Sequence, residues 1–275
     1  MDPYDARRGD PDLRSGSGSL SLGHWVSWRL SHHICLSPRR FIGDEPLVSF
    51  CFDDAPTSAV TNGARMLEDH GARGTFYLAT GLLGGATADF TMLDEDGVRN
   101  LHRNGHEIAL HGHAHLAAHI HTRESFERDL MENRTRVAAI CPGLTLDHFA
   151  YPYGAMSLTV KRALHRLTAT SRGITAGLNG RCFDAHNLRA VELSERTITV
   201  QELHSYFEAA RVSCAWLVFF SHDVSDRPSR FGCSLRLFSR ALEGASACGL
   251  RIATVGEAFI QTRPLGSWLG KHIAR

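Results

Sequence analysis

From Pro46 onward, short runs of apolar, β-branched and aromatic residues alternate with helical patterns. The predicted strands are 47–52, 75–79, 107–110, 147–151, 168–171, 190–193, 216–221 and 251–254. The predicted helices are 57–70, 93–104, 122–140, 157–166, 199–211, 234–248 and 255–261. Strands that alternate with helices form a parallel sheet covered by those helices. The pattern therefore predicts an α/β fold, a distorted (β/α) barrel of seven to eight parallel strands, with an open doubly wound sheet as the alternative.

The chain of 275 residues is long enough for one such barrel. Residues 1–18 are rich in Gly, Ser, Asp and Arg and are predicted to be a disordered tail. Residues 19–45 are predicted to be an N-terminal extension that packs on the domain. The barrel itself is expected over 46–262, followed by a C-terminal tail over 263–275.

Composition excludes several classes of protein. The 30 basic and 29 acidic side chains are scattered, which argues against a nucleic-acid partner. The seven cysteines are widely spaced with no C-x-x-C pair, so neither a disulfide framework nor a cysteine zinc site is expected. We find neither a secretory signal pattern nor a run of transmembrane length, and we expect a cytoplasmic location. The sequence does not indicate an oligomeric state.

Polar residues follow four of the predicted strands. Asp53 and Asp54 follow strand 47–52, His111 follows 107–110, Tyr153 follows 147–151, and His222 follows 216–221. In a β/α barrel, the carboxyl ends of the strands meet on one rim, where active sites lie. The sequence therefore predicts a catalytic site that these side chains share.

His111 and His115 belong to a stretch, residues 102–121, that holds seven of the chain's seventeen histidines. If a helical turn begins after the strand, positions i and i+4 lie close together, and two imidazoles with one carboxylate make a three-ligand metal site with room for water. The second carboxylate of the Asp pair is then free to act on that water. His222 has the chemistry of a general acid, and the turn at Tyr153 exposes a backbone N–H that suits an oxyanion.

Each of these residues also has a structural interpretation. The Asp pair could cap a helix, the histidines could be surface residues that bind metal adventitiously, His222 could be a core histidine, and Tyr153 could be a packed aromatic. The convergence of four strand ends favours the catalytic interpretation. His113 is expected to point away from the metal.

In this order the motifs resemble carbohydrate esterase family 4, the polysaccharide deacetylases that share the NodB homology domain. The family's Thr-Phe-Asp-Asp corresponds to Cys51–Asp54. Its His-Ser/Thr-x-x-His corresponds to His111–His115, Arg-x-Pro-Tyr-Gly to Ala150–Gly154, and Leu-x-His-Asp to Phe220–Asp223. The similarity spans about 46–260. The stretches 64–77 and 221–226 are most similar to the holdfast and exopolysaccharide deacetylases of Gram-negative bacteria.

The resemblance implies a hydrolase that removes N-acetyl groups from N-acetylhexosamine units of a polysaccharide, an oligosaccharide or its lipid-linked precursor. It implies a divalent metal, Zn²⁺ or another ion such as Co²⁺, held by Asp54, His111 and His115. Asp53 is then the general base, His222 the general acid, and Tyr153 the donor of a backbone N–H to the oxyanion.

The chain departs from the family at three motifs, in the first of which Cys51 replaces the threonine. Ala150 stands where the family has an arginine that orients the base, and the Asp-Trp motif has no clear match, with Asp184 or Arg189 as the nearest candidates. Two other functions fit parts of the pattern. A non-haem Fe(II) oxygenase uses the same two-His-one-carboxylate ligands, and a catalytically decayed protein on this fold could still bind carbohydrate.

Overall fold

The computed structural model describes residues 22–87 and 89–265, so the predicted tail over 1–18 lies outside the described residues. The α-helices are α1 (Leu22–His33), α2 (Arg65–Asp69), α3 (Glu95–Arg103), α4 (Arg123–Ile140), α5 (Leu158–Leu167), α6 (Val200–Ser213), α7 (Leu235–Ala247) and α8 (Val255–Phe259). Three short turns of other helix types are η2 (Ala59–Ala64), η3 (Ala118–Ile120) and η4 (Pro152–Gly154).

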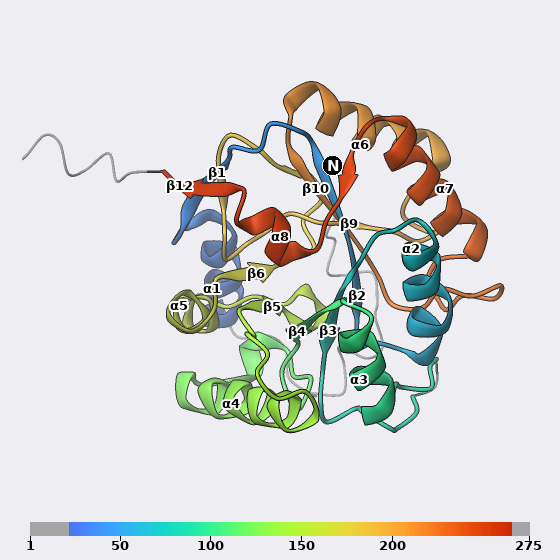
Figure 1. Ribbon diagram of the computed structural model, residues 1–275. Coiled ribbons are helices and arrows are strands. Elements are labelled where there is room, and N and C mark those ends of the chain that lie inside the picture. The colour runs from blue at the N-terminus through green and yellow to red at the C-terminus, as the bar shows by residue number, and fades with distance from the viewer. Residues whose placement is uncertain (1–21, 88, 266–275) are drawn as a thin grey trace, which may run out of the picture.

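A sheet of nine strands forms the centre of the molecule, with helices packed around it (Figure 1). Its strands are β2 (Leu47–Asp53), β3 (Thr75–Leu78), β4 (Glu107–Leu110), β5 (His148–Ala150), β6 (Thr170–Arg172), β7 (Leu178–Asn179), β9 (Val191–Glu192), β10 (Trp216–Ser221) and β11 (Arg251–Ile252). Only β7 is antiparallel to its neighbour. The other eight strands of this sheet are parallel, and they correspond to the eight predicted strands.

The strand order is that of a barrel. Strands β6, β5, β4, β3 and β2 lie side by side in sequence order and β10 follows, whereas a doubly wound sheet reverses direction at its centre. Leu188 forms a parallel bridge with Arg172 of β6, and β9 pairs with β10 a few residues later. The segment 188–192 therefore links the two edges, which confirms the predicted distorted barrel.

Alternation along the strands divides the core into two parts. Side chains that include Phe50, Phe52 and Phe219 pack outward against the helices. Cys51, Tyr77, Ala109, Ala150 and Phe220 share the inner cluster. The same alternation places Asp53 and Arg172 on the inner side at the carboxyl ends of β2 and β6.

A second, three-stranded sheet was not predicted. It consists of β1 (Pro38–Phe41), β8 (Phe183–Asp184) and β12 (Thr262–Pro264), all antiparallel. The strands are two to four residues long and come from distant parts of the chain, so they carry no periodic signal of their own. The predicted domain boundary at residue 262 falls inside β12.

Helix α1 contacts the barrel through α5. The Leu158 amide donates to Ser27 Oγ, and the Lys161 ammonium donates to the carbonyls of Ser31 and Ile34 at 2.6 and 2.7 Å. Lys161 is fully buried and also lies 2.7 Å from a carboxylate oxygen of Asp184. A buried lysine thus joins α1, α5 and β8 at one point.

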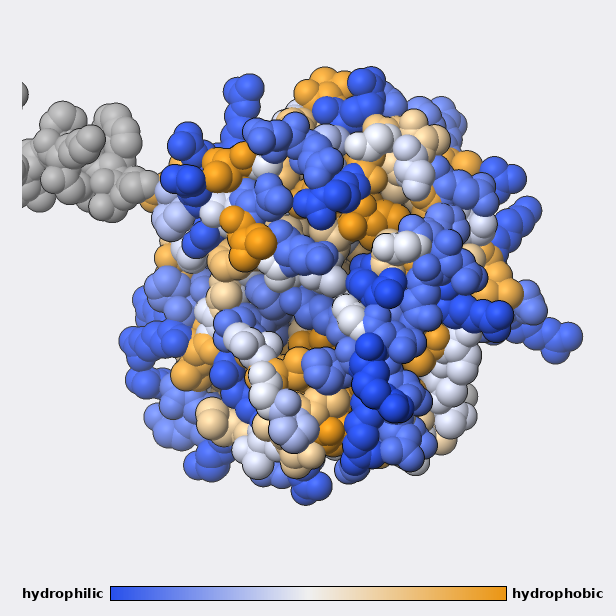
Figure 2. Space-filling view, viewed as in Figure 1, coloured by the Kyte–Doolittle hydropathy of each residue, from blue (hydrophilic) through white to orange (hydrophobic). Residues whose placement is uncertain are grey.

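The visible face of the molecule is largely hydrophilic, with separate hydrophobic patches between polar residues (Figure 2). Within 22–87 and 89–265, no helix is both long and apolar enough to cross a membrane.

We predict that Lys161→Met lowers the free energy of unfolding by roughly 3–5 kcal/mol, because it leaves a buried carboxylate without its cation. Urea denaturation at pH 7 measures the effect, with Arg162→Met on the exposed side of the same helix as the control. Burial raises the pKa of Asp184. The ammonium of Lys161 and the backbone N–H donors outweigh this effect, so the pKa of Asp184 is lowered overall. The loss in the free energy of unfolding should therefore be full above about pH 4, the pKa of Asp184 in the unfolded chain. It should fade as the pH falls through the lower pKa of Asp184 in the folded protein. Equal effects of both substitutions would contradict this role.

Candidate active site

The structure brings Asp54, His111 and His115 together at the carboxyl ends of β2 and β4. His115 Nε2 lies 3.1 Å and His111 Nε2 lies 3.6 Å from the same oxygen of Asp54. Two ligands of a tetrahedral zinc ion with bonds near 2.0–2.1 Å stand roughly 3.3 Å apart. The three donor atoms therefore have the spacing of a metal site.

Two properties of these residues fit a metal ion. Asp54 Oδ1 is buried and accepts no hydrogen bond from the described residues. Burial, reinforced by the charge of Asp53 and only partly offset by His222, raises the pKa of Asp54 to about 6. Burial lowers the pKa of His111 to about 3 and that of His115 to about 4, so both imidazoles are neutral at pH 7, as metal ligands must be.

His111 is oriented by its neighbours. Its Nδ1 lies 2.8 Å from the Ala150 carbonyl, which only an N–H at that position can satisfy, so Nε2 is left as the ligand atom. Its backbone amide donates to Asn133 of α4, whose own amide donates to Leu78 and Thr80. The ring is thus fixed from two sides.

His115 reaches the site by a different route from the predicted helical turn. Residues 112–115 form a loop in which His115 has a φ of 51°. The Asp129 carboxylate accepts the amides of His113 and Ala114 at 2.9 and 2.8 Å. Gly112 has a φ of +80°, and a Cβ there would lie 2.8 Å from that carboxylate. The prediction of a helical turn was wrong because Gly112 and Asp129 shape the loop instead.

Asp53 has a partner that the sequence analysis missed. Arg172 of β6 is fully buried, and its Nη2 donates to both carboxylate oxygens of Asp53. Burial alone would raise the pKa of Asp53, but Arg172 and the nearby histidines His111 and His222 lower it overall. Asp53 is therefore ionised at neutral pH.

Arg172 lies beside the position of the motif arginine. Ala150 of β5 and Arg172 of β6 are direct partners in the sheet, so the guanidinium is carried by the neighbouring strand at the same level. It lies over the rings of Phe220 and Tyr77, 4.7 and 5.1 Å from their centroids. Arg172 directly follows the predicted strand 168–171, so the strand-end rule that selected Asp53 would also have selected it.

The two residues suggested for the missing Asp-Trp motif lie elsewhere. Asp184 binds Lys161 and accepts backbone amides at the start of β1. Arg189 donates to the Ala176 carbonyl and packs on Gly177. Within the described part of the chain, neither forms a hydrogen bond or ion pair with Asp53, Asp54, His111 or His115, so the structure does not support this suggestion.

His222 follows β10 and lies between two aromatic rings. Phe90 stacks on it at 6.0 Å and Phe231 tilts against it at 5.3 Å. Its Nδ1 is buried and has no hydrogen-bond partner in the described part of the chain. His222 also lowers the pKa of both Asp53 and Asp54, which places it on the same rim.

Tyr153 lies in the turn after β5. Its backbone has a φ of 58°, and its ring centroid is 4.6 Å from that of His115. The same left-handed conformation occurs at Asp54, Ala55 and His115. Among the described residues, the one other non-glycine residue with a positive φ is Cys214. Strained backbone is therefore concentrated at the predicted site, as is common where function requires a fixed geometry.

Comparison with known proteins gives a consistent result. A sequence model of the family described as polysaccharide deacetylase matches residues 42–171. The chain is 28% identical over 113 residues to a chitooligosaccharide deacetylase of Sinorhizobium fredii (strain NBRC 101917 / NGR234). That match covers 41% of this chain and 49% of the relative, so the chain spans about half the length of the curated relative.

Solved structures share the fold. The chitin deacetylase of Colletotrichum lindemuthianum is 17% identical with a TM-score of 0.58, covering 79% of this chain and 89% of its own. A family 4 acetyl xylan esterase of Clostridium thermocellum, solved with a cobalt ion, is 17% identical with a TM-score of 0.53, covering 78% and 90%. The family match over residues 42–171, this fold and the four motifs at its strand ends together support a polysaccharide deacetylase of the NodB type, as found in carbohydrate esterase family 4.

Proposed function

We propose that this chain is a metal-dependent hydrolase that removes the N-acetyl group from N-acetylhexosamine units of an oligosaccharide or polysaccharide and releases acetate. The observation that carries the proposal is the different environment of two adjacent carboxylates. Asp54 faces two neutral histidines and has no arginine or lysine partner among the described residues, whereas Asp53 is paired with Arg172. Asp54 therefore suits a metal ligand, and Asp53 suits a general base.

Asp54, His111 and His115 would hold the ion, and we propose Zn²⁺, with Co²⁺ as another ion that the site could accept. When bound, such an ion polarises the acetamide carbonyl and lowers the pKa of a water molecule. Asp53, kept ionised by Arg172, takes the proton from the attacking water. The backbone N–H of Tyr153 donates to the oxyanion that forms at the carbonyl carbon. His222 then protonates the departing amine as the C–N bond breaks.

The substrate proposal rests on the similarity to a chitooligosaccharide deacetylase and on the sequence similarity to exopolysaccharide deacetylases. The fold itself serves both amide and ester substrates in the neighbours named above, so it does not choose between them.

Two rival functions have weaker support. An Fe(II) oxygenase needs the ligand triad but has no use for an ionised carboxylate held beside it by a buried arginine. The case for a decayed carbohydrate-binding protein rested on the missing arginine at Ala150, and Arg172 now contacts the base from the next strand.

We predict that the metal-loaded protein releases acetate from N-acetylglucosamine oligomers faster than from acetylated xylan. A chelator should abolish the release, and Zn²⁺ or Co²⁺ should restore it. An enzyme-coupled acetate assay gives both rates. Release from the xylan alone would make the chain an esterase, and release that survives complete metal removal would contradict the mechanism.

We also predict that Arg172→Ala lowers kcat by roughly 10²-fold or more, because the base loses its fixed position. Without the guanidinium the pKa of Asp53 rises, so the acidic limb of the kcat/KM profile moves to higher pH. The double variant A150R/R172A returns the arginine to its position in the family motif and should recover part of the rate. R172K, which keeps the charge, should keep the acidic limb near its original pH.

Thermal unfolding of each variant separates catalytic from structural loss. A folded Arg172→Ala protein with an unchanged rate and pH profile would show that Asp53 does not depend on Arg172.

A further inference from the structure

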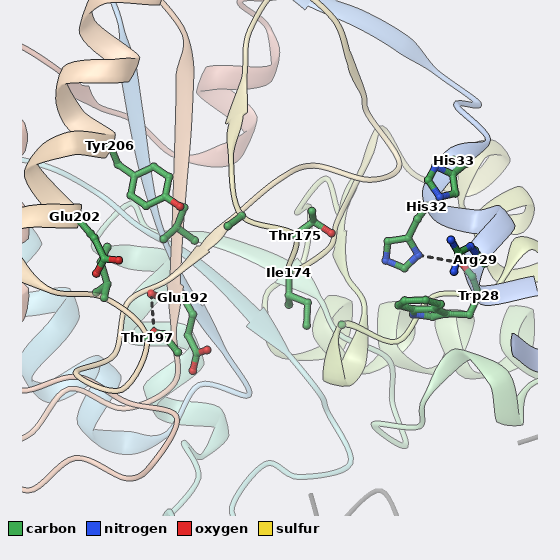
Figure 3. Close-up of a pocket in the computed structure, with 14 residues that line it drawn as sticks. Trp28, Arg29, His32, His33, Ile174, Thr175, Glu192, Thr197, Glu202 and Tyr206 are labelled. Atoms are coloured by element: carbon green, nitrogen blue, oxygen red, sulfur yellow. Dashed lines mark hydrogen bonds between the residues drawn. The ribbon is translucent and has the colours of Figure 1, made fainter. Parts of the chain in front are cut away.

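A cavity of about 520 Å³ lies beside the proposed active site, between α1 and α6. Trp28 and His32 of α1 line one end, Glu202 and Tyr206 of α6 the other, and Ile174 lies between them (Figure 3). Cavities of this size bury small organic ligands. The mechanism proposed above makes no use of this space.

The cavity adjoins the site at two points. Gly154, which follows Tyr153 in the turn after β5, is part of its lining. Glu192 lines it from the carboxyl end of β9, where burial and the charge of Asp53 raise the pKa of its carboxyl group. A ligand in the cavity would therefore extend toward the same rim as the reacting acetamide.

The lining has the chemistry that recognises a sugar ring. Trp28 and Ile174 offer apolar surface to the C–H face of a pyranose, and Thr175, Glu192 and Tyr206 offer polar groups to its hydroxyls. Charged groups of both signs line the cavity, with Arg29 on α1 opposite the two glutamates. This balance favours a neutral polar ligand over a polyanion.

The wall that carries Trp28 is fixed in place. The His32 ring packs 4.6 Å from the Trp28 ring, and its Nδ1 lies 2.9 Å from the Trp28 carbonyl. One turn further on, buried Lys161 binds the carbonyls of Ser31 and Ile34. A preformed wall lowers the entropic cost of binding.

We propose that this cavity is a binding subsite for the N-acetylhexosamine unit next to the one that is deacetylated, with Trp28 as its stacking surface. This inference rests on the proposed function and adds which part of the chain contacts the neighbouring sugar unit. Helix α1 precedes residues 42–171, which match the family model, so the wall that carries Trp28 comes from the N-terminal extension of this chain.

The test compares kcat/KM for the tetramer and the monomer of N-acetylglucosamine in the metal-loaded full chain. The wild type should prefer the tetramer, and Trp28→Ala should reduce that ratio about tenfold, the scale of one aromatic contact. Trp28→Phe keeps an aromatic ring and should retain most of the preference. Leu30→Ala alters an exposed residue of the same helix, 42% exposed and outside the lining, and should leave the ratio unchanged.

Three results would overturn the subsite: no tetramer preference in the wild type, an unchanged ratio in Trp28→Ala, or the same drop in Leu30→Ala. If no substrate releases acetate, the proposed function fails and calorimetry with the tetramer decides the subsite separately. If Trp28→Ala then binds the tetramer more weakly than Leu30→Ala does, the subsite is supported. If the wild type does not bind the tetramer, the subsite is overturned.

Discussion

The buried ion pair between Arg172 and Asp53 is the interaction on which the site depends. Two carboxylates in sequence at one buried rim repel each other, and each would cost several kcal/mol if left without a counter-charge. Arg172 provides that charge for Asp53 alone. Asp54 is left with a raised pKa and an oxygen aimed at two neutral histidines, which is the condition under which a cation binds. The ion pair thus gives the two carboxylates the different environments that their proposed roles require.

The sheet explains how the arginine could change position. Ala150 and Arg172 are partners on adjacent strands and their side chains point into the same barrel interior. The small side chain at 150 leaves space there, while its carbonyl still orients His111. An arginine on β6 can therefore contact Asp53 although alanine stands at the motif position on β5.

Much of the fold could be predicted because its strands are short apolar runs between strongly patterned helices. The strand-end rule then brought Asp53, Asp54, His111 and His222 to one rim. Arg172 was missed because it was sought within the motif that holds Ala150 rather than on the next strand. Residues 112–115 were misread because spacing alone does not reveal that Asp129, from a later helix, fixes the loop. Strands β1, β8 and β12 depend wholly on tertiary pairing.

The division of labour between the two aspartates is the central claim. Elemental analysis of purified Asp53→Asn and Asp54→Asn, each loaded with Zn²⁺ and dialysed, tests it together with acetate release from N-acetylglucosamine oligomers. We expect Asp53→Asn to keep one zinc ion per chain while its turnover falls roughly 10²–10⁴-fold, the contribution of a general base. Asp54→Asn should lose the zinc. Zinc loss in Asp53→Asn with retention in Asp54→Asn would contradict the assignment.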